Sequence, residues 1–258
     1  MTRRAMLRTV EFGAPVLLVA LWWFVSEAAP RSLYFPPLRD IWAAFRANWV
    51  FAGIGTDVVP TLTGIGLGYA VSVVAGIAIG VALGSLPALH DFLHPVIDFC
   101  RSLPSSAAVP IFILLVGVGM EMKVAVVTFA ALWTVILNTS EAVAGADPVV
   151  TDTSRSYRIG RLDRLLFVTI PAASPQIVVG MRVALNQSII LIIVAEIMVS
   201  THGIGFFLKN AQWHFDLTGM WSGLLLVGVV GYALSRLFLL FESRVLAWHR
   251  GLHGKAQP

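Results

Sequence analysis

The residues of this sequence that could do chemistry are few, and the most unusual of them is an acid inside an apolar run. Glu196 lies among isoleucines and valines in the run 177–199, and Asn186 and Gln187 precede it by two to three helical turns. Such polar side chains are costly in apolar surroundings, so they mark candidate paths or gates for a polar solute. On a straight helix Gln187 and Glu196 differ by about 180°, so these two cannot face one path.

Glu196 also has a structural interpretation, as a carboxyl that hydrogen-bonds a neighbouring helix or the turn 201–205. A second apolar run, 124–143, carries further hydroxyl, amide and indole groups. For these groups, hydrogen bonding between helices is the alternative to lining a path. The candidate pathway or gate residues are Thr128, Trp133, Asn138, Asn186, Gln187 and Glu196.

A cluster of histidines and acids invites a metal hypothesis. His90, Asp91, His94 and Asp98 lie close together, but they follow no recognised metal-binding spacing. The single cysteine, Cys100, excludes an intramolecular disulfide. The sequence contains no phosphate-binding P-loop, no H-E-x-x-H pair and no G-x-S-x-G elbow. We therefore expect no catalytic residue, no metal site and no cofactor bound by this chain.

The elements that must position these residues are apolar helices. The chain is 57% hydrophobic and 12% charged, with a mean hydropathy of +0.83, whereas soluble domains carry about 25% charged residues. Its length suits one polytopic domain in lipid, with no nucleic-acid partner, because its basic residues flank the apolar runs. We expect an all-α membrane protein of about six spans: 14–29, 61–86, 105–118, 124–143, 177–199 and 220–241.

The segments between the runs have their own predictions. Pro36 and Pro37 start an amphipathic surface helix with Ile41, Trp42 and Phe45 on one face. A short polar connection covers 90–104, and a tight turn after the third run holds Glu121 and Lys123. In the second run a small residue recurs every fourth position, which predicts a helix-packing face. These small residues are Gly64, Gly68, Ser72, Gly76, Gly80 and Gly84.

One long polar stretch, 147–175, interrupts the second half of the chain. Asp147 and Pro148 provide a helix N-cap and a first-turn proline. The stretch predicts two short helices hinged near Gly160, closed by Pro171 and Pro175 before the next run. Arginines recur every third residue in it, at Arg155, Arg158, Arg161 and Arg164. A basic loop lying on anionic lipid is the alternative interpretation.

The distribution of lysine and arginine predicts the orientation. With the amino terminus inside and six spans, most of the 18 Lys and Arg residues fall on the cytoplasmic side, including those of the stretch 147–175. The carboxyl-terminal tail 247–258 falls there too. The cations expected outside are Arg31, Arg39, Arg46, Lys123 and Lys209.

The stretch 147–175 resembles the cytoplasmic loop of permease subunits of type I ABC importers. That loop reads E-A-A, three residues, G, nine residues, then I-x-L-P. Aligned on Pro171, Asp152, Thr153 and Ser154 take the E-A-A positions, and Arg158 falls where the family has glycine, with Gly160 two residues later. The fragments FPPLRDIW, HPVIDFCRSLP, GVGMEMK, GMRVAL and AEIMVSTHGIGF, between residues 35 and 206, are similar to the nitrate/sulfonate/taurine branch of this family.

The resemblance implies residues that couple to an ATPase and a structural part for Glu196 near the outer gate. The implied coupling residues are Asp152, Thr153, Ser154, Arg155, Ser156, Tyr157, Arg158, Gly160 and Pro171. Gly160 is expected to replace the missing family glycine. A second departure is Ser105-Ser106-Ala107-Ala108, where the branch commonly has prolines and an aromatic residue; this segment borders the pathway.

The resemblance also implies a function and partners. The chain would be a single permease domain in a bacterial inner membrane, with both termini cytoplasmic. It would comprise a first span and outer amphipathic segment (1–60), a five-span core (61–246) with the coupling loop 147–175, and the tail 247–258. Its partners would be two ATPase subunits that bind ATP-Mg, an identical or paralogous second permease, and an extracytoplasmic binding protein. It would move a small polar solute such as a sulfonate, taurine or nitrate. A self-contained secondary transporter or channel is the alternative, although it would need an intramembrane ion site.

Overall fold

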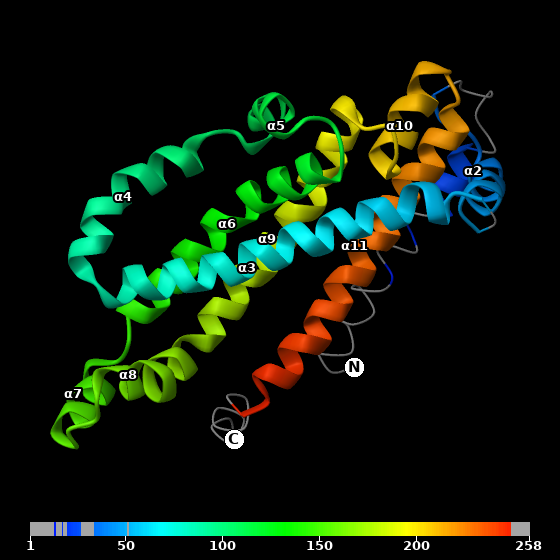
Figure 1. Cartoon of the computed structure of the whole chain (residues 1–258). Helices are drawn as coiled ribbons and strands as arrows, with labels where there is room; N and C mark the ends of the chain where they lie inside the picture. Colours follow the sequence, from blue (N-terminus) through cyan, green and yellow to red (C-terminus); the bar gives the residue numbers. More distant parts are fainter. Residues whose placement is uncertain (1–12, 14–16, 18–19, 27–33, 51, 249–258) are drawn as a thin grey trace, which may run out of the picture.

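The computed structural model describes residues 13, 17, 20–26, 34–50 and 52–248, and the regular structure in these ranges is helical throughout. Residues 20–26 form a helix inside the expected first span, 14–29, half of which lies outside the described residues. The end of the tail, 249–258, also lies outside them. The path of the chain can be followed in Figure 1.

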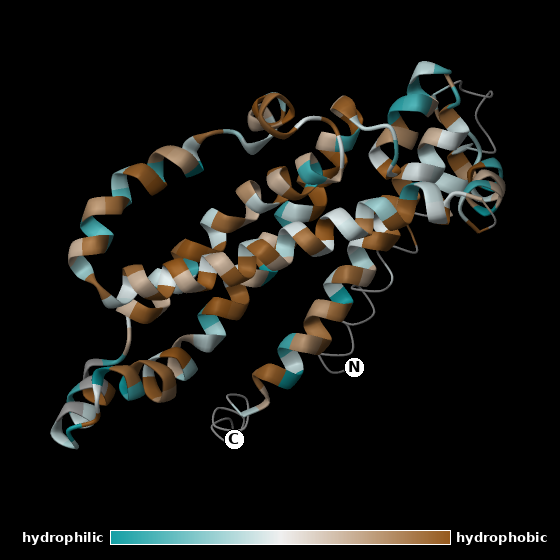
Figure 2. Cartoon of the chain, viewed as in Figure 1, coloured by the Kyte–Doolittle hydropathy of each residue, from teal (hydrophilic) through white to brown (hydrophobic). Residues whose placement is uncertain are grey.

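Four continuous helical segments within the described residues are long and apolar enough to cross a membrane. The first joins a π-helical turn, η2 (Ile54–Val58), to α3 (Val59–Ser85), and the second is α6 (Met120–Ala144). The third joins α8 (Arg161–Arg164), a π-helical turn η4 (Leu165–Thr169) and α9 (Ile170–Val199); the fourth is α11 (Leu217–Val245). Figure 2 shows hydrophobic residues along most of the length of these helices. The second, fourth, fifth and sixth expected runs are therefore helices, as predicted.

The predictions of a span at 105–118 and of a polar connection at 90–104 are wrong. Residues 87–102 form a helix, α4 (Pro87–Ser102), followed by a 3₁₀ turn η3 (Ser105–Ala108) and by α5 (Val109–Val116). The helices on either side of this break are bent by 87°, so they form one broken span or a re-entrant loop. The break has a local cause: Leu103 precedes Pro104 and is extended, at φ −69° and ψ 127°, because a residue before proline disfavours the helical region. The described residues therefore contain four or five spans, and six stays a prediction.

Helices α3 and α6 pack along the predicted stripe of small residues. A Cβ atom added to Gly68 would lie 2.7 Å from Val127 Cβ, and one added to Gly76 would lie 2.7 Å from Val135 Cβ. Gly80 meets Thr139 in the same way, at 2.6 Å. These separations leave no room for a side chain, so the stripe lets the two backbones approach closely, as predicted.

Short helices gather at one end of the long ones, which we call the α10 end (Figure 1). Here α2 (Leu38–Phe45) packs against α11, and the π-helical turn η1 (Arg46–Val50) follows α2. In α2, Ile41 is buried, whereas Trp42, which was expected on the same face, is 55% exposed and stacks on Phe45. Helix α10 (Ile204–Trp213), which packs between α9 and α11, was not expected from the sequence.

At the opposite end, called the α7 end, the two predicted short helices project beyond α3 and α6 (Figure 1). They are α7 (Pro148–Ser156) and α8. The prediction that Pro171 and Pro175 close this stretch is wrong, because both lie inside α9. Pro171 directly follows η4, so its missing N–H falls where π-helical hydrogen bonding changes to α-helical bonding. Pro175 leaves the Pro171 carbonyl without its helical donor, and Ser174 Oγ donates to that carbonyl at 2.8 Å instead.

Candidate functional site

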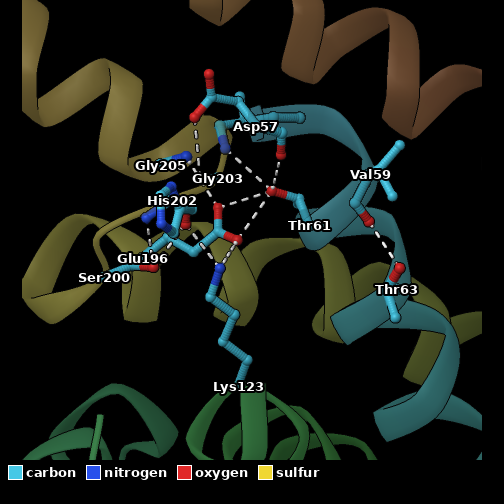
Figure 3. Close-up of polar contacts among 11 residues, drawn as sticks. Asp57, Val59, Thr61, Thr63, Lys123, Glu196, Ser200, His202, Gly203 and Gly205 are labelled. Carbon is cyan, nitrogen blue, oxygen red and sulfur yellow. Dashed lines mark hydrogen bonds and ion pairs between the residues drawn. The ribbon is translucent and has the colours of Figure 1, made fainter. Parts of the chain in front are cut away.

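A buried ion pair joins α6 to α9 at the α10 end (Figure 3). Lys123 Nζ lies 2.8 Å from Glu196 Oε1; the glutamate is 0% exposed and the lysine 4%. Lys123 Nζ also donates to the His202 carbonyl at 2.7 Å. The expectation that Lys123 lies in an outer turn is therefore wrong: α6 begins at Met120 and carries Lys123 in its first turn, facing α9.

Two further helices contribute donors to the same carboxylate. Thr61 Oγ1, from the first turn of α3, lies 2.8 Å and 2.9 Å from the two oxygens of Glu196. The Gly205 amide, from the first turn of α10, donates to Glu196 Oε2 at 3.0 Å. Thr61 Oγ1 also accepts the Ile204 amide at 3.0 Å. One carboxylate thus ties together α3, α6, α9 and α10.

The turn before α10 is shaped around this carboxylate. Gly203 has φ +122°, which side chains rarely adopt, and a Cβ atom there would collide with the Glu196 carboxylate. A Cβ on Gly205 would lie 2.6 Å from Glu196 Cβ. The Gly203 amide is held by Asp57 Oδ1 at 3.1 Å. The spacing of Glu196 and the two glycines therefore has a direct steric reason.

These contacts give Glu196 the neighbours that its structural interpretation requires. A buried carboxylate needs a partner charge and further donors to offset its desolvation, and both are present. Gln187 and Glu196 both bond to side chains of α6, Thr134 and Lys123 respectively. The sequence analysis did not predict Lys123 as the partner of Glu196, because a cation at the edge of the apolar run 124–143 is usually a flanking residue. A lone acid inside an apolar run was nevertheless a signal that a cation should lie near it.

The other candidate pathway residues bridge α6 and α9 nearer the middle of these helices. Thr134 Oγ1 donates to Gln187 Oε1 at 2.7 Å, and Gln176 Nε2 donates to Asn138 Oδ1 at 3.1 Å. Asn138 Nδ2 in turn donates to the Thr134 carbonyl at 2.9 Å. Amide and hydroxyl groups therefore hold α6 and α9 together here.

The remaining three candidates have different surroundings. Thr128 Oγ1 donates to the Gly68 carbonyl on α3 at 3.2 Å. Asn186 is exposed. The Trp133 indole packs against Phe129 and the apolar cluster around Leu83, and its Nε1 is buried with no acceptor in the described structure. Trp133 and Asn186 therefore do not join Gln187 in one cluster.

The candidate coupling residues form a capped helix and a tight turn at the α7 end. Asp147 Oδ1 accepts the Val149 amide at 2.8 Å, which is the predicted N-cap. Residues 152–156 lie in α7, with Ser154 buried and the Arg155 side chain outside the described part. Tyr157 follows the helix and is 79% exposed. Pro171 lies apart from this group, in α9.

The turn after α7 places Arg158 in the conformation that glycine usually supplies. The Ile159 amide donates to the Ser154 carbonyl at 3.1 Å, and Arg158 has φ +53°. This is the Schellman arrangement, in which the left-handed residue after a helix is most often glycine. Gly160 has φ −57°, so the expectation that it replaces the family glycine is wrong. Because Arg158 is not helical, the four arginines do not line one helix face.

A cavity of about 990 Å³ lies between the α7–α8 pair and the ends of α3 and α6. Its walls come from the ends of α3 and α6 and from α8 and η4, and Asp152, Arg161 and Arg164 line it. The α7–α8 pair is therefore not packed tightly against α3 and α6, and it is joined to the spans mainly through the continuous helix that runs into α9.

These features define a multi-pass helical membrane protein with a buried ionic tie at one end and a projecting polar helix pair at the other. The chain belongs to the family described as the binding-protein-dependent transport system inner membrane component, whose model matches residues 72–247. It is therefore a permease subunit of an ABC importer, as the sequence resemblance implied.

Two curated relatives fall within the branch that the resemblance indicated. The taurine transport system permease protein TauC of Escherichia coli (strain K12) is 25% identical over 247 residues, 93% of this chain and 90% of that protein. The nitrate import permease protein NrtB of Synechocystis sp. (strain ATCC 27184 / PCC 6803 / Kazusa) is 28% identical over 194 residues, 75% of this chain and 70% of that protein. A chain of the MetNI methionine ABC transporter, solved in inward-facing conformations, shares the fold with a TM-score of 0.63 at 18% identity; the match covers 73% of this chain and 94% of that one.

Proposed function

We propose that this permease carries a small oxyanion-bearing solute such as a sulfonate, taurine or nitrate, and that α7 with the turn after it couples transport to ATP hydrolysis. Binding and hydrolysis of ATP-Mg would take place in two separate ATPase subunits, and this chain would contribute neither a cofactor site nor a catalytic residue. An extracytoplasmic binding protein would deliver the solute. The relatives named for taurine and nitrate transport support the solute class.

The observation that carries the coupling proposal is an exposed aromatic residue on a polar helix pair beyond the spans. Tyr157, directly after α7, is 79% exposed, and Val149, in the first turn of α7, is 71% exposed. Large apolar side chains exposed outside a membrane span favour a protein partner, and aromatic residues dominate such contacts. The α7 end would then be cytoplasmic and the α10 end extracytoplasmic, with both termini in the cytoplasm.

The pathway would run between two permease copies, identical or paralogous, along faces of the broken span, α6 and α9. ATP-driven approach of the ATPase subunits would move the α7–α8 pairs, and the long helices would rock between inward-open and outward-open states. Gln187 and Asn138 would border this path, whereas Glu196 would act as a structural tie beside its outer end.

Copurification tests the coupling proposal. The tagged permease is co-expressed with its ATPase subunit, extracted in detergent, and assayed for the ATPase that it retains. Tyr157→Asp should lower retention at least about tenfold, since loss of a central aromatic contact costs 2 kcal/mol or more. The matched control is Tyr34→Asp at the α10 end, where Tyr34 is 69% exposed. Equal retention by both variants would contradict the assignment of α7.

A self-contained transporter is tested separately. Purified permease without an ATPase, reconstituted in liposomes, should not accumulate taurine or nitrate in response to an ion gradient. Accumulation under those conditions would favour the alternative.

Substitution of Asp152 or Arg155 should also release the ATPase, because the resemblance places both in the coupling segment.

A further inference from the structure

A second cavity, of about 290 Å³, lies where the broken span meets α6 and α9. Its polar lining comes from Ser105 and Ser106 on η3 and from Gln187 on α9, and its other walls are apolar residues, including Ala130 of α6. Gln187 and Ala130 both lie near the middle of their helices. The cavity is therefore at mid-depth of the spans.

The backbone beside this cavity cannot face lipid. The chain between α4 and η3 is extended at Leu103 and Pro104, which interrupts the helix, although the Leu103 amide donates to the Cys100 carbonyl at 3.3 Å and the Pro104 carbonyl accepts the Ala107 amide at 2.8 Å. At membrane depth such backbone is tolerated only when it is buried in protein or lines a water-filled cavity. Ser106 is exposed, so the described residues do not cover it.

The hydroxyls of Ser105 and Ser106 differ from those of other serines in the long helices. Ser140 Oγ donates to the Leu137 carbonyl and Ser188 Oγ to the Ala184 carbonyl, which satisfies each hydroxyl within its own helix. Neither Ser105 nor Ser106 has a hydrogen-bond partner within the part of the chain that the structure describes. Both hydroxyls are therefore available to a molecule in the cavity.

One hydrogen bond orients the carboxamide of Gln187. Its Oε1 accepts the Thr134 hydroxyl at 2.7 Å, and its Nε2 has no partner in the described structure. A carboxamide fixed in this way offers N–H groups to the cavity, and an ionised oxyanion offers only acceptors. Thr134 is thus a positioning residue that sets the polarity of the cavity.

None of the residues that line the cavity is charged. A pathway must bind its solute well enough to admit it and weakly enough to release it. Neutral hydroxyl and amide donors meet that requirement for an anion better than a buried arginine or lysine, whose charge-assisted bonds are roughly twice as strong.

We propose that this cavity, with Ser105, Ser106 and the fixed amide of Gln187 as donors, is a solute-contact site that takes an oxyanion group (sulfonate, nitrate or carboxylate) during transport. The proposal rests on the proposed function, because it assumes a solute path along α6 and α9. It also gives a physical role to the Ser105-Ser106 segment, at which this sequence departs from the pattern that it resembles.

Cysteine modification tests the site without knowledge of the natural solute. Cys100 is the only cysteine of the chain, so Cys100→Ser gives a background for single cysteines. In the permease–ATPase complex in membranes, the Ser106→Cys variant is treated with a sulfonate-bearing methanethiosulfonate and with its quaternary-ammonium counterpart. The measured quantity is the ratio of the anionic to the cationic modification rate. The matched control is Ser102→Cys, whose native hydroxyl already bonds to the Asp98 carbonyl at 2.7 Å.

The rate ratio should be about tenfold higher for Ser106→Cys than for Ser102→Cys, the effect of one additional charge-assisted hydrogen bond. Adding Gln187→Leu should return the ratio to the control value, and millimolar nitrate or taurine should slow modification where glycerol does not. A ratio equal to the control, or unchanged by Gln187→Leu, would overturn the site. The copurified ATPase is measured for every variant. Loss of the ATPase from the Cys100→Ser parent would count against the proposed function. A variant that retains the ATPase but shows no preference for the anionic reagent would count against the cavity alone.

Discussion

Removing Lys123 should destabilise the protein far more than removing any exposed lysine. In Lys123→Met, the carboxylate of Glu196 stays buried but keeps only Thr61 and the Gly205 amide as donors. Loss of one partner from a buried ion pair costs about 3–5 kcal/mol. At about 2–4 °C for each kcal/mol, the melting temperature should fall by about 6–20 °C.

The double variant separates the pair from general damage to packing. Lys123→Met combined with Glu196→Gln removes both charges, so it should cost less than the sum of the two single changes, with a coupling of about 1–3 kcal/mol. The assay is the thermal loss of the monodisperse peak of purified permease in detergent at neutral pH. The control is Lys209→Met, which removes a half-buried lysine bonded to the Met198 carbonyl at 3.1 Å, beside Trp213, and should cost about 1 kcal/mol or less.

Two results would refute this reasoning. The first is a melting temperature of Lys123→Met no lower than that of Lys209→Met, which would mean that Glu196 finds another partner or that water reaches it. The second is strict additivity of the two single changes, which would mean that each residue acts through its own packing rather than through their contact.

Three further predictions concern single positions. Arg158→Gly should relieve the left-handed backbone at φ +53° and stabilise the turn after α7 by about 1 kcal/mol, seen as slower amide exchange over 148–160, with uptake intact or modestly weakened; faster exchange would contradict this. Gly76→Ala should destabilise the protein by about 1–3 kcal/mol, because the new Cβ would lie 2.7 Å from Val135, whereas Gly66→Ala, with open space around it, should be neutral in the same thermal assay. Gly203→Ala should lower the melting temperature more than Gly66→Ala, since its Cβ would strike the Glu196 carboxylate, and equal melting temperatures would argue against the steric fit.

The sequence predicted the parts of this fold that depend on periodic patterns. Long apolar runs gave α3, α6, α9 and α11, because lipid demands about twenty apolar residues for each span. The small-residue stripe of α3 gave its packing face against α6, because close approach needs small residues at a fixed interval. The N-cap at Asp147 was also readable, since capping depends on neighbours in the chain.

The predictions that were wrong failed for a different physical reason. Lys123 was assigned to a turn because its partner Glu196 is 73 residues away, and no local pattern encodes that contact. Residues 90–104 were predicted to be a polar connection because of His90, Asp91, His94 and Asp98, although all four lie in α4. Arg158 takes the left-handed position because the turn after α7 is fixed by the hydrogen bond from Ile159 to Ser154, which outweighs the residue's own preference.

The continuity of one helix links both ends of the molecule to the cavity between them. Residues 161–199 form a single helical segment of 39 residues, about 58 Å long at 1.5 Å per residue, from the turn after α7 to the ion pair at Glu196. Because Glu196 is fixed to α3, α6 and α10, a displacement of α8 cannot simply slide this helix along its axis. The displacement must instead tilt or bend the helical segment 161–199. Gln187 lies between α8, at the end that moves, and Glu196, at the end that is fixed. The proposed contact with the solute therefore lies where motion of the α7 end would change the width of the cavity, while the ionic tie keeps the α10 end together.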